Sequence, residues 1–237
     1  MMLYAECRNR LKAEDFAFIQ KALSESEEEN SVLLDLFKDE ESRDSLLDHR
    51  LVYERLIDEC KCLQVSSELY FYVLTRWMLK RVGIDDRLFA DYIASVLVSF
   101  SQGANNKKIK RTDPSMGYHR PYISDMLALI QEAGSDEAFL IRSHIADYSL
   151  FISGIFADRV KAYQERRGGP DIGFYEGMGR ANYHCASSHR LAKDSDLEEV
   201  FGRLSEQFHE VRCALNHLAD NHLHFEGPDQ DLLIISS

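Results

Sequence analysis

The chain has 237 residues, of which 45% are hydrophobic and 29% are charged. This balance excludes a disordered chain, which would be less hydrophobic, and an integral membrane protein, which would carry fewer charges. The formal net charge of −12 disfavours nucleic acids as partners, because phosphate binding requires a basic surface.

The first residues alternate between apolar and charged side chains, which leaves no continuous apolar core for a signal peptide. The most apolar stretch, Tyr92–Phe100, is about half as long as the ~20 residues that a membrane-spanning helix needs. We therefore expect a cytoplasmic protein that makes no membrane contact. The five cysteines include no C-x-x-C pair and are expected to be reduced thiols.

The first 113 residues contain no proline, which favours long helices in this half of the chain. Apolar residues recur at helical spacing from Leu33 to Leu63, and Asn30 or Ser31 can cap the start of this segment. A deeply buried helix is expected to begin at Ser66–Ser67 and to end at Gly83.

The next helix is capped by Asp85–Asp86 and ends near Gly103. Residues 103–120 then combine Gly, Asn, Pro and a short basic run, which predicts one long loop. This loop is either a solvated connection or a docking segment for an acidic partner or nucleotide, through Lys107, Lys108, Lys110 and Arg111. It separates two helical sets, 1–102 and 121–226, within an expected single domain 1–237.

The second half predicts helices over 122–132 and 138–167, the latter either continuous or broken near Asp147 to Ser149. Residues 168–171 (GGPD) end that helix and start another, over 172–192. A last helix is expected over 196–225. The only strand signal is the short tail LLIIS. The sequence therefore predicts an all-α, single-domain bundle of about eight helices.

Three glycines, Gly173, Gly177 and Gly179, lie inside the helix predicted over 172–192. Each costs ~1 kcal/mol relative to alanine, so a packing contact should offset them. Gly173 and Gly177 are four residues apart and share one face. We interpret them as the place where a neighbouring helix approaches closely, such as the helix that carries Ser153 and Gly154.

Polar side chains recur along the last two predicted long helices. Glu176 and Arg180 lie one turn apart beside a stripe of tyrosines, and Arg212, Asn216 and Asp220 recur every four residues. Facing each other, the two lines would enclose a polar pocket. The alternatives are an ion pair satisfied within the core and a boundary between core and water. The candidate ligand-binding residues are Tyr175, Glu176, Arg180, Tyr183, Arg212, Asn216 and Asp220.

A metal site is not expected. His209, Cys213 and His217 lie at successive fours, but the first and last are ~12 Å apart along a helix and cannot share one ion. The sequence has no H-E-x-x-H, phosphate loop or G-x-S-x-G motif, and we identify no base near a serine or cysteine. We therefore predict no cofactor.

Four segments are long and distinctive: ELYFYVLTRWMLKRVGIDDRLFADYIASVLVSF, ADYSLFISGIFADRV, FYEGMGRANYHCASSH and VRCALNHLADNHL. Together they resemble an uncharacterised family of bacterial all-helical cytoplasmic proteins. The resemblance spans most of the chain and implies a bacterial, cytoplasmic and helical protein. It implies no activity, ligand or catalytic residue.

Two functions are consistent with these observations. A helical chain without a recognisable nucleophile, metal set or phosphate loop favours a non-catalytic interaction or regulatory protein, acting as a homodimer or with a protein partner. The alternative is a small-molecule-binding or hydrolytic enzyme whose polar pocket lies between the last two long helices.

Overall fold

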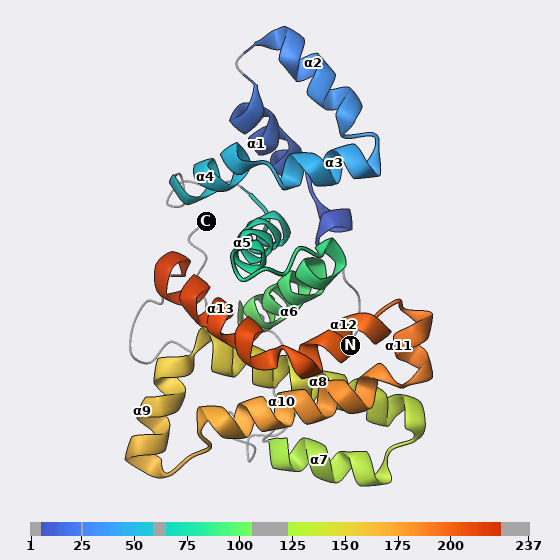
Figure 1. Ribbon diagram of the computed structural model, residues 1–237, viewed down its shortest axis with the longest axis vertical. Coiled ribbons are helices and arrows are strands. Elements are labelled where there is room, and N and C mark those ends of the chain that lie inside the picture. The colour runs from blue at the N-terminus through green and yellow to red at the C-terminus, as the bar shows by residue number, and fades with distance from the viewer. Residues whose placement is uncertain (1–5, 25, 59–64, 106–122, 224–237) are drawn as a thin grey trace. The chain divides into compact units, whose positions relative to one another are not determined.

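The computed structural model describes residues 6–24, 26–58, 65–105 and 123–223. Within these ranges the chain forms thirteen α-helices, one short 3-10 helix and no strand (Figure 1). The prediction of an all-α protein is confirmed, although we expected about eight helices. No helix in the same ranges is both long and apolar enough to cross a membrane.

The described chain divides into two compact units. The N-terminal unit comprises residues 6–101 and 220–223, and the C-terminal unit comprises residues 102–219. The boundary lies beside the division that we expected at residue 102. The assignment of both helical sets to one domain stays a prediction.

The N-terminal unit is built around two apolar helices, and local caps define where they begin. Ser66 caps the buried helix α5 by accepting a hydrogen bond from the backbone of Leu69 at 3.1 Å. Gly83, with a φ of 83°, follows its end, as predicted. Asp86 caps α6 through the backbone N–H of Phe89 at 3.0 Å. The helices are η1 (Arg8–Arg10), α1 (Ala13–Leu23), α2 (Glu27–Leu36), α3 (Glu40–Leu47), α4 (Arg50–Asp58), α5 (Ser67–Arg81) and α6 (Arg87–Asn105).

The segment expected to be helical from Leu33 to Leu63 is divided among α2, α3 and α4. Ser26, rather than Asn30 or Ser31, caps α2. Asp39 interrupts the segment, because its side chain accepts a hydrogen bond from the backbone N–H of Ser42 at 2.8 Å and so starts α3. The end of the predicted segment and the predicted 103–120 loop fall largely outside the described residues.

In the C-terminal unit, α10 packs along α8 and against α12 (Figure 1). Gly168, with a φ of 65°, ends α9, and Asp171 caps α10 by accepting a hydrogen bond from the backbone of Phe174 at 2.7 Å. Both ends were predicted. The helices are α7 (Ile123–Glu132), α8 (Ser135–Ile155), α9 (Ala157–Arg167), α10 (Ile172–Ser187), α11 (Arg190–Asp194), α12 (Glu198–Glu206) and α13 (Phe208–His222).

Three predicted helices are broken at unexpected places. The break after α8 lies at Phe156, not near Asp147 to Ser149. The hydroxyl of Ser149 donates to the carbonyl of Ile145 at 2.7 Å, so this serine continues the helix instead of ending it. The final helix is divided at Gln207 into α12 and α13, and the helix expected over 172–192 is divided at Ser188 and His189 into α10 and α11.

Close packing of α13 depends on two glycines. A Cβ on Gly179 of α10 would lie 2.1 Å from the ring of Phe208, and a Cβ on Gly154 of α8 would lie 2.9 Å from the Cβ of Leu215. Gly154 therefore lies at a close helix contact, but with α13 and not with the Gly173 and Gly177 face of α10 that we expected. The prediction for Gly173 and Gly177 is wrong for the described chain. Apart from the backbone of its own helix, a Cβ on Gly177 meets nothing within 4 Å, and one on Gly173 meets only the side chain of the capping Asp171.

We expect Gly179→Ala to lower the free energy of unfolding by about 1–3 kcal/mol, because the new methyl group would collide with Phe208. Gly202→Ala in α12 is the matched control, since a Cβ there meets nothing within 4 Å. Helix propensity should make that variant more stable by about 1 kcal/mol. Urea titration of both variants measures the difference, and a stabilised Gly179→Ala would contradict the packing described here.

Candidate functional site

Glu176 connects α10 to α13 within the C-terminal unit. Its Oε1 accepts a hydrogen bond from Arg212 Nε at 2.5 Å and lies 3.0 Å from Nδ1 of His209. The side chains of Glu176 and Arg212 are 22% and 12% exposed, so this ion pair lies at the edge of the core. The structure thus brings together one residue from each of the two predicted polar lines.

The other candidates on α10 have different surroundings. Arg180 does not bind Glu176, and its Nε donates to the carbonyl of Ser205 at 3.1 Å. Tyr183 is fully buried and donates to Oδ1 of Asp147 at 2.7 Å. The Tyr183 hydroxyl is therefore used in a hydrogen bond within the core.

The remaining candidates do not join Glu176 either. Tyr175 packs against a hydrophobic cluster of α7 and α8, and its ring lies 6.5 Å from that of Tyr148. Asn216 is half-buried and Asp220 is exposed. No contact joins Asn216 to Glu176 among the described residues, and Asp220 belongs to the N-terminal unit. Ligand binding by the seven candidates stays a prediction. Among them, Glu176 and Arg212 are joined by a direct side-chain contact.

The sequence did not lead us to expect a thiol beside the Glu176–Arg212 ion pair. Cys213 is exposed, its Sγ lies 3.6 Å from Nε2 of His209, and it accepts a hydrogen bond from Arg212 Nη2 at 3.0 Å. The expectation that no cysteine has a base nearby in sequence is therefore wrong. The four-residue spacing was the available signal, because it suits a hydrogen bond as well as a shared metal. Within the described chain, no group of three or more His, Cys, Asp or Glu could hold a metal ion.

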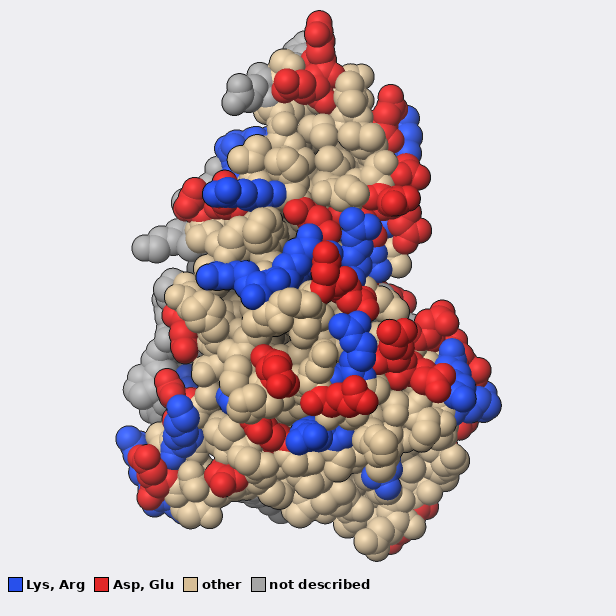
Figure 2. All heavy atoms as spheres, viewed as in Figure 1, with Lys and Arg blue, Asp and Glu red and all other residues tan. Residues whose placement is uncertain are grey.

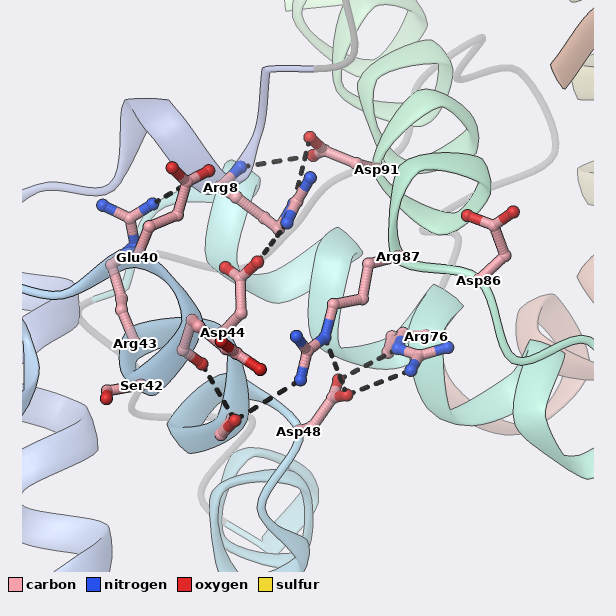
Figure 3. Close-up of polar contacts among 12 residues, drawn as sticks. Arg8, Glu40, Ser42, Arg43, Asp44, Asp48, Arg76, Asp86, Arg87 and Asp91 are labelled. Carbon is pink, nitrogen blue, oxygen red and sulfur yellow. Dashed lines mark hydrogen bonds and ion pairs between the residues drawn. The ribbon is translucent and has the colours of Figure 1, made fainter. Parts of the chain in front are cut away.

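The N-terminal unit contains a second polar cluster, which the sequence did not reveal (Figure 3). Asp48, just after α3, accepts hydrogen bonds from Nε and Nη2 of Arg76, both at 3.0 Å. Lys80 Nζ lies 3.1 Å and Arg87 Nε 3.3 Å from the same carboxylate. Burial alone would raise the pKa of Asp48, but the hydrogen bonds and charges of Arg76 and Lys80 bring it below its ordinary value.

Arg8 forms the other half of this cluster and ties η1 to α3 and α6. Its guanidinium contacts Asp44, and its Nε lies 3.4 Å from Oδ2 of Asp91 (Figure 3). The backbone N–H of Arg8 also donates to Asp91 at 3.2 Å. Burial raises the pKa of Asp91, although the charge of Arg8 opposes this shift. The positive charge of Arg8 therefore lies beside the negative charges of Asp44 and Asp91 where η1, α3 and α6 meet.

Several buried atoms of the cluster have no hydrogen-bond partner in the described part of the chain. They include the Tyr72 hydroxyl, Thr75 Oγ1 and Arg76 Nη1 on one face of α5, and Asp44 Oδ1 on α3. An unsatisfied buried polar atom costs ~1–3 kcal/mol. The cluster therefore fixes the mutual orientation of its helices while adding less stability than its number of ion pairs suggests.

Comparison with protein-family models, curated proteins and solved structures gave no match. The resemblance to a bacterial helical family, and the origin that it implies, therefore stay predictions.

We expect Asp48→Asn to lower the free energy of unfolding by about 1–3 kcal/mol at neutral pH, because the buried Arg76 loses one of its two carboxylate partners and keeps only Asp85. Since the folded state keeps the pKa of Asp48 below its ordinary 3.8, its stabilisation is complete above that pH and is lost as the pH falls further. The deficit of the variant should shrink over the same range.

Asp35→Asn is the control for this measurement, because Asp35 also pairs with a lysine but is 75% exposed. Its free energy of unfolding should match that of the wild type within error. Equal effects of the two substitutions in urea titrations at several pH values would show that the Asp48 cluster is not stabilising.

Two buried tyrosines should respond in opposite ways to the loss of a hydroxyl. Tyr72→Phe removes a hydroxyl without a partner in the described chain and should leave stability unchanged or raise it. Tyr183→Phe removes the 2.7 Å hydrogen bond to Asp147 and should lower stability by about 2 kcal/mol. Thermal and urea unfolding of both variants would test this contrast, which fails if Tyr72→Phe is the more damaging substitution.

Proposed function

We propose that this chain is a non-catalytic helical interaction protein that self-associates through one face of α10. The observation that supports this proposal is the exposed strip of Gly173, Gly177 and Ala181 along α10, whose glycines make no packing contact with another helix of the described chain. Gly177 lies in the interior of α10 and weakens the helix by ~1 kcal/mol relative to alanine, whereas Gly173 lies in the first turn beside the capping Asp171. Gly154 and Gly179 have a reason to be glycine in the packing of α13, whereas Gly177 has open space around it, as Gly202 of α12 also has. What distinguishes Gly177 is the strip of small exposed residues to which it belongs.

The face that contains these glycines is smooth and exposed. Gly173, Gly177 and Ala181 follow one another at four-residue intervals, and all three are exposed. Phe174 lies beside them with 41% of its surface exposed. Few Lys, Arg, Asp and Glu side chains appear over α7 and α10 in Figure 2. Such a strip allows another helix to approach the α10 backbone closely, and the phenylalanine ring supplies apolar area.

A second copy of this chain fits the strip. In an antiparallel two-fold pairing centred near Gly177, Phe174 of one copy lies over the small residues Gly177 and Ala181 of the other, and the reverse contact forms by symmetry. The pairing also brings the Phe174 and Arg180 ends of the two helices to the same level, where a guanidinium can lie near an aromatic ring.

Charge does not oppose this contact, although the chain as a whole is acidic. Glu176 is the only carboxylate between Ile172 and Ser187, and Arg212 neutralises it. The proposal keeps the cytoplasm as the location, in agreement with the free thiols of Cys7, Cys185 and Cys213. The enzyme alternative has weaker support, because Tyr175 and Tyr183 pack into the interior.

Gly177→Leu should weaken self-association at least about tenfold, because a large side chain at the crossing point keeps the two backbones apart. The matched control is Gly202→Leu, which places the same side chain at another mid-helix glycine with open space around it. Sedimentation equilibrium over a range of concentrations measures the dissociation constant, and circular dichroism verifies folding.

A wild-type chain that stays monomeric at its highest soluble concentration would overturn the proposal. Equal weakening by both leucine variants would also overturn it, since α12 is not part of the proposed interface. Phe174→Ala tests the ring contact separately and should weaken the dimer without lowering the stability of the monomer.

A further inference from the structure

Three side chains of the C-terminal unit form a continuous chain of contacts that ends at a thiol. Glu176 Oε1 lies 3.0 Å from Nδ1 of His209, and Nε2 of the same ring lies 3.6 Å from Sγ of Cys213. The chain crosses from α10 to α13. It does not involve the glycine face and is independent of the proposed self-association.

The order of these contacts determines the role of the imidazole. A carboxylate only accepts hydrogen bonds, so a neutral His209 ring carries its hydrogen on Nδ1 and directs it to Glu176. Nε2 is then left with a lone pair that faces the thiol. A carboxylate, an imidazole and a thiol in this order form the arrangement in which a base accepts a proton from a nucleophile.

Arg212 strengthens the arrangement from a second direction. Its Nε binds Glu176 and its Nη2 donates to Sγ of Cys213 at 3.0 Å. A guanidinium beside sulfur stabilises negative charge there. The thiol itself is exposed, and the side chain of His209 is 61% exposed, so large reagents can reach the sulfur.

We propose that Cys213 is a thiol–disulfide exchange site that reacts with small soluble disulfides such as oxidised glutathione. His209 accepts the thiol proton, and Sγ of Cys213 attacks one sulfur of the disulfide. The old S–S bond breaks as the new bond forms, and the leaving thiolate takes the proton from His209. Cys213 is oxidised to a mixed disulfide, and one half of the reagent is reduced to a free thiol.

The exposed position favours a disulfide over an acyl substrate. Attack on a carbonyl needs hydrogen-bond donors positioned around the developing oxyanion and a pocket that orients the substrate. Disulfide exchange needs an accessible sulfur, a proton acceptor and stabilisation of the negative charge on sulfur. Cys213, His209 and Arg212 supply these three requirements.

The test uses the full chain incubated with oxidised glutathione, quenched with acid at intervals and analysed by peptide mass spectrometry, which gives a rate for each cysteine. Cys185 is the internal reference, because it is exposed and its thiol contacts no His or Arg in the described chain. Cys7 is the unreactive reference, because burial raises its pKa to about 12. We expect Cys213 to react about tenfold faster than Cys185 or more.

Three variants assign the cause. His209→Ala should reduce the rate at Cys213 to that of Cys185, and Glu176→Gln should reduce it several-fold because the ring loses its charged partner. His184→Ala replaces an exposed histidine of α10 outside the contact chain and should change neither rate. Because His209 is largely exposed, its variant should remain folded, and His209→Asn provides a second polar substitution for the same measurement.

Similar rates at Cys213 and Cys185 would overturn the proposal. A fast Cys213 that keeps its rate in both His209 variants would also overturn it, because the proposed proton acceptor would then be irrelevant. A selective loss of rate in the His209 variants, with Cys185 unchanged, supports it.

Discussion

The helix packing of the C-terminal unit depends on the close approach of α13 to α8 and α10. This approach is possible because Gly154 and Gly179 have no Cβ where Leu215 and the ring of Phe208 lie. Larger residues there would displace α13, and Glu176 would lose Arg212 and His209 as partners. A steric requirement at two glycines thus controls the polar contacts on which both the α10–α13 ion pair and the Cys213 proposal depend.

In the N-terminal unit, ion pairs orient the helices, whereas in the C-terminal unit the fit of side chains against glycines does so. Arg76 is nearly fully buried and holds Asp48, and Arg8 holds Asp44 and Asp91. Such pairs recover little free energy beyond the cost of removing them from water. Breaking one partner is far more costly than having neither, so the cluster makes alternative packings of η1, α3, α5 and α6 unfavourable. Its unpartnered atoms add to the cost of the cluster.

On α10, the residues proposed for self-association and the residue proposed to act in thiol exchange, Glu176, lie on different faces. Glu176 and Gly179 face the neighbouring helices, and Gly173 and Gly177 face outward with Phe174. The outward face uses Gly173, Gly177 and Phe174, whereas the contact chain to the thiol uses Glu176, His209 and Cys213. Self-association and thiol exchange can therefore be present in one chain and can be removed by different substitutions, which allows each to be tested while the other is intact.

The sequence by itself determined the all-α class and those helix ends that depend on nearby residues: Ser66, Gly83, Asp86, Gly168 and Asp171 act through atoms at most a few positions away. It also placed Glu176 and Arg212 among the candidates. Only the tertiary structure decided that Glu176 binds Arg212 and His209 instead of Arg180, that Asp48 lies beside a buried arginine, and that Gly179 rather than Gly177 admits a neighbouring helix. These outcomes depend on residues 25 or more positions apart meeting in space, and periodicity along one helix carries no information about which helix it will face.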